Sequence, residues 1–152
     1  MKSREDIHIN APPSKVWDVL SDPNLMELWN PKCAHSDAGP GPYTVGFTYK
    51  AGFTLGSRPP QVSDCTIEEY EPERCITTKY TGMAFKPDGE VTERYELTAK
   101  DNGTRLRQFV DYTHSGLPLF IRLIMKFIHT FGYSAGRGPL EGIKELAEDR
   151  PT

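Results

Sequence analysis

The chain is poor in the residues and patterns that mark several classes of protein. Its three cysteines, Cys33, Cys65 and Cys75, are odd in number and lack the short paired spacing of a zinc site, so we expect reduced thiols inside a cell. No glycine-rich loop stands between a strand pattern and a helix pattern, and the histidines form no paired motif. The sequence therefore indicates no metal, no nucleotide and no other cofactor.

Neither sign of charge dominates. Lys plus Arg number 18 and Asp plus Glu 21, which gives a net charge of -3 over 152 residues without a basic run or an acidic tail. Nucleic acid and anionic membranes are therefore not expected as partners, and a small neutral or apolar molecule is favoured by elimination. The first residues, MKSREDI, are charged and do not resemble a signal peptide, so we expect a cytoplasmic protein.

No hydrophobic run is long enough for a transmembrane helix. The most apolar stretch, Leu117–Phe131, would form a helix of roughly 22 Å against about 30 Å of bilayer core, and Arg122 and Lys126 interrupt it. On a helix its apolar residues gather on one face: Phe120, Ile124, Phe127, Ile128 and Phe131. We expect this helix to close the core of a sheet and to form a cavity wall, with a membrane-surface face or a homodimer face as alternatives.

The patterns that are present begin with a strand and two short helices. Ile7 and Ile9 alternate with polar residues until Ala11-Pro12-Pro13 stops the strand. Helical spacing follows in Val16, Trp17 and Leu20, with proline in or just before the first turn. Asp22-Pro23 then provides an N-cap and a first helical residue for a second helix, whose apolar side is Leu25, Leu28 and Trp29.

The middle of the chain reads as strands. Cys33–Asp37 is a weak strand pattern, 43–49 alternates well with Tyr43, Val45, Phe47 and Tyr49 on one face, and 51–60 fits either a loop or a ragged hairpin. A turn at 71–74 would place Ile67 opposite Thr78 and Cys65 opposite Tyr80.

The last hairpin has the clearest turn signal. Asn102-Gly103 suits a two-residue type I′ turn that pairs Asp101 with Thr104, and therefore Leu97 with Gln108 and Tyr95 with Val110. The predicted inner face of this hairpin is Glu93, Tyr95, Leu97, Leu106, Gln108, Val110 and Tyr112.

The terminal helical pattern is interrupted. Gly132, Gly136, Gly138 and Pro139 predict a kink or break, after which Leu140, Ile143, Leu146 and Ala147 resume an apolar stripe. The whole order predicts one α+β domain over 1–152: two short helices after the first strand, and a six- to seven-stranded curved antiparallel sheet wrapped around a long C-terminal helix. Such a sheet leaves more interior than one helix can fill, which gives room for a ligand.

Several motifs carry a family resemblance over nearly the whole chain. INAPPSKVWDVLSDPNLMELWNP (Ile9–Pro31), CTIEEYEPERC (Cys65–Cys75), the TAKDNGTRL hairpin and the glycine-interrupted terminal helix resemble the START-like (SRPBCC, Bet v 1-like) superfamily, close to its polyketide cyclase/dehydrase branch. The resemblance implies the helix-grip fold and an internal cavity for lipids, sterols, hormones, quinones or aromatic polyketides. It implies no shared catalytic motif.

The candidate ligand-binding residues combine apolar walls with a few polar groups. They are Phe47, Tyr49, Ile67, Tyr80, Glu93, Tyr95, Gln108, Tyr112, Phe120, Ile124 and Phe127. The alternative for the aromatic residues is plain core packing, and for Glu93 and Gln108 it is a solvated cavity mouth. If Glu93 is buried, its raised proton affinity would suit a general acid or base.

Three functions remain open on this evidence. The first is a carrier or sensor that binds a hydrophobic, aromatic, acyl or lipid-like molecule. The second is a cofactor-free cyclase or dehydratase acting in the same cavity, with Glu93 as its weak catalytic candidate. The third, an interaction module like the co-chaperones of the superfamily, would need an exposed apolar patch.

Overall fold

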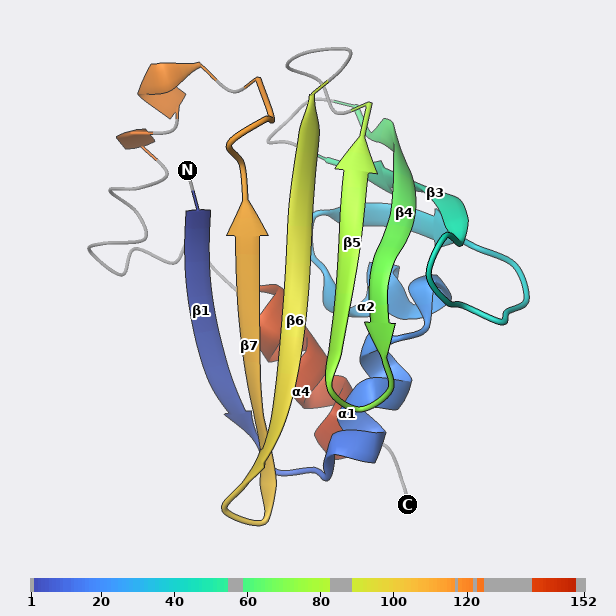
Figure 1. Ribbon diagram of the computed structural model, residues 1–152, viewed down its shortest axis with the longest axis vertical. Coiled ribbons are helices and arrows are strands. Elements are labelled where there is room, and N and C mark those ends of the chain that lie inside the picture. The colour runs from blue at the N-terminus through green and yellow to red at the C-terminus, as the bar shows by residue number, and fades with distance from the viewer. Residues whose placement is uncertain are drawn as a thin grey trace.

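The computed structural model describes residues 2–54, 59–82, 89–116, 118–121, 123–124 and 138–149. Within them, seven antiparallel strands form one sheet in the order β1-β7-β6-β5-β4-β3-β2 (Figure 1). The strands are β1 (Lys2–Ile9), β2 (Cys33–Asp37), β3 (Thr48–Phe53), β4 (Gln61–Glu71), β5 (Cys75–Thr81), β6 (Glu90–Lys100) and β7 (Gly103–Asp111). The helices are α1 (Pro13–Leu20), a 3-10 turn (Pro23–Leu25), α2 (Met26–Trp29) and α4 (Pro139–Asp149).

The helices lie together on one face of the curved sheet (Figure 1). Helix α4 contacts α1, α2 and β1, and α1 contacts β6 and β7. Ile9, Val16, Val19, Leu106 and Ile143 are fully buried where these layers meet. The α+β helix-grip architecture predicted from the sequence is therefore confirmed, with seven strands and with two short helices after the first strand.

The predicted register of the last hairpin is wrong by two residues. Asp101 and Asn102 form the turn, with φ of 50° and 62°, so that Lys100 pairs with Gly103 and Tyr95 with Gln108. Gly103 is the first residue of β7, and it must be glycine there because a Cβ would collide with the backbone oxygen of Ile9. A shift of two residues keeps side-chain parity, and the predicted inner face of the hairpin is therefore correct.

The β4–β5 hairpin has the predicted pairing near its centre. Ile67 lies opposite Thr78 and Cys65 opposite Tyr80. A bulge between Ile67 and Glu69 then reverses the parity of β4, so Glu69 pairs with Thr77 on the outer face.

The predicted strand at 43–49 begins only at Thr48. The Tyr43 hydroxyl bonds to the Gly39 carbonyl and accepts a 2.7 Å hydrogen bond from the Asn24 side chain, which holds the preceding segment in a loop. Gly46, with φ of 91°, turns the chain into β3. Of the ambiguous segment 51–60, residues 51–53 belong to β3, and 55–58 lie outside the described residues.

The second helix turns a different side to the core from the one predicted. Asp22 caps the 3-10 turn as expected, since its Oδ1 accepts a 3.0 Å hydrogen bond from the Asn24 N–H. Helix α2 is one turn that starts at Met26, so Met26 and Trp29 are buried and Leu28 is 54% exposed.

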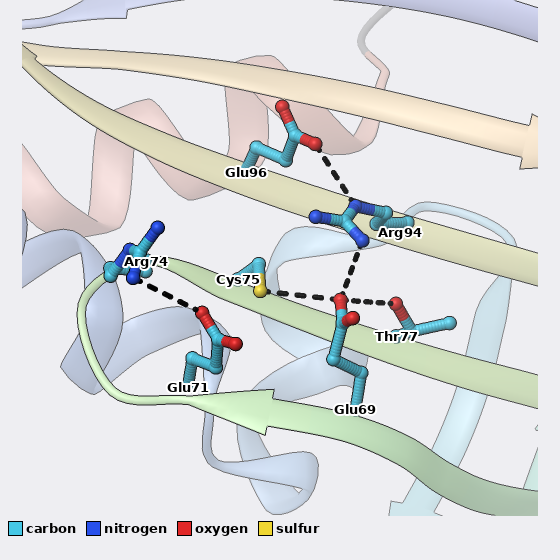
Figure 2. A network of polar contacts seen from close by, with 7 residues as sticks. All are labelled: Glu69, Glu71, Arg74, Cys75, Thr77, Arg94 and Glu96. Atoms are coloured by element: carbon cyan, nitrogen blue, oxygen red, sulfur yellow. Dashed lines mark hydrogen bonds and ion pairs between the residues drawn. The ribbon is translucent and has the colours of Figure 1, made fainter.

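The outer face of the sheet carries a network of charged side chains (Figure 2). Arg94 bridges two carboxylates, with Nη1 2.6 Å from Glu69 Oε1 and Nε 3.0 Å from Glu96 Oε1. The same Glu69 oxygen accepts hydrogen bonds from Cys75 Sγ and Thr77 Oγ1, both at 3.2 Å. Burial and the neighbouring Glu69 raise the pKa of the Cys75 thiol to about 12, so this cysteine is not a reactive thiolate.

Helix α4 packs against α2 so tightly at Gly142 that the methyl group of an alanine there should destabilise the fold. A Cβ on Gly142 would lie 2.8 Å from both Cα and C of Trp29, and closer still to its carbonyl oxygen. We expect Gly142→Ala to lower the free energy of unfolding by about 2 kcal/mol in urea denaturation, although alanine favours a helix by about 1 kcal/mol. Gly52→Ala is the matched control, because its Cβ would meet nothing closer than 3.8 Å. Equal stability of the two variants would contradict the packing described here.

Candidate functional site

A cluster of polar side chains lies on the inner face of the sheet, among residues that are mostly apolar or aromatic. Glu93 Oε2 accepts a 3.0 Å hydrogen bond from Gln108 Nε2, and Glu93 Oε1 accepts one of 3.2 Å from the Tyr80 hydroxyl. Gln108 Nε2 also lies 3.1 Å from the Tyr95 hydroxyl, to which it donates. The cluster therefore joins strands β5, β6 and β7 through one carboxyl group.

Strand pairing explains why these residues meet. Thr78 lies opposite Glu93, and Tyr95 lies opposite Gln108, so adjacent strands present these side chains to the same face. Tyr80, Tyr95 and Gln108 are buried, and Glu93 keeps part of its side chain accessible. The predicted inward placement of Glu93 and Gln108 is correct.

The surroundings of Glu93 disfavour its charged form. Burial raises the pKa of this carboxyl above its usual value, and the hydrogen bonds from Gln108, Tyr80 and Tyr95 only partly offset the effect. Burial and the Glu93 carboxyl also raise the pKa of Tyr80 and Tyr95 well above the normal range. These hydroxyl groups are therefore neutral hydrogen-bonding groups.

The two cysteines of the interior are equally inert. Burial raises the pKa of Cys33 to about 11 and that of Cys65 to about 12. Neither thiol is a nucleophile at neutral pH. No group of His, Cys, Asp or Glu within the described residues could hold a metal ion.

A small cavity adjoins the polar cluster. Its volume is about 20 Å³, enough for roughly one water molecule. Its lining combines the inner face of the sheet with the short helices: Leu20, Ser21, Pro23, Met26, Trp29, Tyr49, Ile67, Ile76, Thr78, Tyr80, Glu93 and Tyr95.

Most of the predicted site residues on the sheet gather here. Tyr49, Ile67, Tyr80, Glu93 and Tyr95 line the cavity. Gln108 is buried beside them, Phe47 packs against the core from its edge, and Tyr112 is half-buried.

The predicted helical wall differs from this picture. Phe120 is 62% and Ile124 52% exposed, so their expected position in the interior is wrong. The described part of their segment lies beyond the end of β7, apart from the helices that pack on the inner face of the sheet (Figure 1). Phe127 lies outside the described residues.

Seven residues that line the cavity were not among the predicted site residues: Leu20, Ser21, Pro23, Met26, Trp29, Ile76 and Thr78. Trp29 has the most distinctive chemistry of these. It lies in α2, borders the cavity and stacks edge-on against Tyr95, with ring centroids 5.9 Å apart. Its Nε1–H is buried and has no hydrogen-bond partner. The sequence places Trp29 on the apolar side of the second helix, which predicts that it is buried. Only the fold shows that Trp29 lines the same cavity as Glu93.

A wider depression lies open on the outer face of the sheet. It has a volume of about 610 Å³ and is lined by charged residues of β1, β4, β6 and β7. Its charges are already engaged with one another, as in the pairs Lys2–Asp111 and Arg94–Glu69. The inner cluster, where a carboxyl group is buried, is the stronger candidate site.

Comparisons with known proteins agree on the family and the fold. Residues 1–147 match the family model described as polyketide cyclase / dehydrase and lipid transport. The chain is similar to protein MLL2253 from Mesorhizobium loti, at 20% identity and a TM-score of 0.68 over 100% of both chains. No curated protein matches the sequence.

Two further solved structures share the fold. The di-domain ARO/CYC BexL from the BE-7585A biosynthetic pathway is 17% identical with a TM-score of 0.69, and the match covers 99% of this chain and 51% of BexL. The Aha1 dimer from Colwellia psychrerythraea is 16% identical with a TM-score of 0.57, over 98% and 97% of the two chains. In the part of this chain that the structure describes, no helix is long and apolar enough to span a membrane.

The raised pKa of Glu93 predicts a pH-dependent stability. Below about pH 4.5 the carboxyl is protonated in the folded and unfolded states and contributes no difference. As the pH rises, the unfolded chain loses this proton more readily, so the native state loses stability until the folded pKa is passed. The free energy of unfolding of Glu93→Gln, minus that of the unsubstituted protein, should therefore be larger at pH 7.5 than at pH 4. Urea denaturation at both values measures it, with the outer-face variant Glu96→Gln as control, and a difference independent of pH would refute the assignment.

Proposed function

Because this chain belongs to the polyketide cyclase / dehydrase and lipid transport family, we propose that it binds a hydrophobic small molecule, aromatic, acyl or lipid-like, in its interior. The ligand lies between the inner face of the sheet and the C-terminal helix of a single domain. Its walls are Tyr49, Ile67, Tyr80 and Tyr95, with Phe47 and Tyr112 as further wall residues, and Glu93 and Gln108 orient it. The protein acts in the cytoplasm, which suits three buried, unpaired thiols.

One observation carries the proposal. The Glu93 carboxyl lies in a mostly apolar interior, and no described lysine, arginine or histidine lines the cavity beside it. Gln108 and Tyr80 satisfy the oxygens of this carboxyl with neutral donors, which do not balance a negative charge. Burying an unbalanced charge lowers the stability of a fold, so packing alone does not account for this residue. Ligand cavities, in contrast, combine apolar walls with a small number of polar groups that fix orientation. The cluster of Glu93, Gln108, Tyr80 and Tyr95 has this composition.

Binding requires the interior to widen. The space within the described walls holds about 20 Å³, far less than the roughly 300 Å³ of a typical ligand pocket. A ligand must therefore displace side chains or move a helix away from the sheet.

Blocking the interior should abolish binding. Thr78 lies on the inner face beside Glu93, and its neighbour Thr77 lies on the outer face. We expect Thr78→Phe to reduce the affinity for the neutral dye Nile red at least tenfold in a fluorescence titration. The matched variant Thr77→Phe should bind as the unsubstituted protein does, and circular dichroism checks that both are folded.

Native mass spectrometry of freshly purified protein completes this test. A retained compound names the ligand class, and the same spectrum gives the oligomeric state, including a homodimer formed through the exposed Leu119, Phe120, Leu123 and Ile124. The absence of any retained compound, together with Nile red binding that Thr78→Phe leaves intact, would overturn the proposal.

Catalysis in the same interior is the second candidate. The raised pKa of Glu93 suits a general acid or base for enolisation, aldol closure or dehydration of a keto compound. We expect Glu93→Gln to lower turnover of the compound identified by mass spectrometry at least 100-fold with a smaller change in its binding. Glu96→Gln, on the outer face, should leave turnover unchanged. Equal turnover in Glu93→Gln would leave binding alone as the function.

A further inference from the structure

The interior contains a hydrogen-bond donor, the indole N–H of Trp29, that pairs with none of the described residues. Trp29 is 4% exposed, and its Nε1–H has no partner. Buried indole N–H groups usually find an acceptor, because leaving one unpaired costs the full price of its desolvation. An indole nitrogen donates and cannot accept, so whatever completes this group must be an acceptor.

The described lining of the same cavity carries an acidic side chain and no basic one. Among the described residues that line it, Glu93 is the one acid, and none is a lysine, arginine or histidine. Lys32 acts on the Glu93 carboxyl from further away, and its influence is smaller than that of burial. A second negative charge brought to this cavity would meet the Glu93 carboxylate in a medium that screens poorly, or would force Glu93 to take up a proton.

We propose that this cavity selects ligands by an uncharged oxygen acceptor, a ketone carbonyl or a phenolic hydroxyl that accepts a hydrogen bond from Trp29 Nε1, and that Glu93 excludes carboxylates. The inference rests on the proposed binding function and narrows its ligand class. Among acyl and aromatic molecules, it favours ketones and phenols over free fatty acids and aryl acids.

A bound water does not remove the basis of this selection. The cavity has room for about one water molecule, which can serve the indole N–H before the ligand arrives. A carbonyl or phenol oxygen that displaces this water restores its hydrogen bond, whereas a hydrocarbon of equal shape does not. The selection is therefore a difference in affinity between two ligands of the same size, one with an oxygen acceptor and one without.

Three probes of one shape separate the two parts of the proposal. They are 2-acetylnaphthalene, its hydrocarbon isostere 2-isopropenylnaphthalene, and the anion 2-naphthoate, each titrated calorimetrically at pH 7.5. The unsubstituted protein should bind the ketone about tenfold more tightly than the alkene, since tenfold corresponds to one hydrogen bond of about 1.4 kcal/mol. It should bind 2-naphthoate at least tenfold more weakly than the ketone.

Two variants assign these preferences to residues. Trp29→Phe keeps an aromatic ring and should remove the preference for the ketone, with the affinity for the alkene unchanged. Glu93→Gln should strengthen binding of 2-naphthoate about tenfold, and the outer-face control Glu96→Gln should not. Because Trp29→Phe could disturb folding, the indole N–H resonances are a second readout: the chain has two tryptophans, and the ketone but not the alkene should shift the one that belongs to Trp29.

The outcomes for the two proposals differ. Equal affinity for ketone and alkene without an indole shift, or naphthoate binding as tight as that of the ketone, overturns the selection and leaves the binding function standing. Failure of all three probes and of Nile red to bind overturns both.

Discussion

The alternation of side chains across the central strands is the constraint on which the site depends. Glu93, Tyr95 and Gln108 share the inner face only because β6 and β7 pair in a register that places Tyr95 opposite Gln108, and the Asp101–Asn102 turn fixes that register. The close contact between Gly103 of β7 and the backbone carbonyl of Ile9 at the end of β1 supports the same register. A slip of one residue would turn either Arg94 of β6 or Arg107 of β7 inward, and it would separate Glu93 from Gln108.

The two faces of the sheet treat their carboxylates in opposite ways. On the outer face, Glu69 and Glu96 both contact the guanidinium of Arg94, so each carboxylate has a cationic partner within the fold. On the inner face, Glu93 receives only neutral donors. Neutral donors solvate a charge without cancelling it, and burial therefore dominates the pKa of Glu93. The fold thus separates a closed, structural set of charges from an unmatched carboxyl beside a cavity.

Sequence reasoning reached the fold and the inner face because both follow from local signals. Strand alternation, the helix cap at Asp22, the prolines and the turn residues can each be recognised within a few positions of the sequence. The two-residue error in the register of the last hairpin left its predicted inner face unchanged. Tertiary contacts decided the rest. The bulge that turns Glu69 outward, the tether of Tyr43 to Asn24 and the exposure of Phe120 and Ile124 depend on partners far away in the chain. Helical periodicity shows which side of a helix is apolar, not whether a sheet lies beneath it.

Trp29 shows how packing and chemistry meet at one residue. Its carbonyl group is where α4 comes closest, so that Gly142 can carry no side chain, and its ring covers Tyr95 beside the buried carboxyl. The backbone of Trp29 therefore holds the C-terminal helix in place while its side chain borders the cavity. A ligand that pushes on the indole ring also pushes on the contact that seats α4. Because Trp29 borders the cavity with its side chain and contacts Gly142 with its backbone, widening of the interior at the indole ring is coupled to the position of this helix.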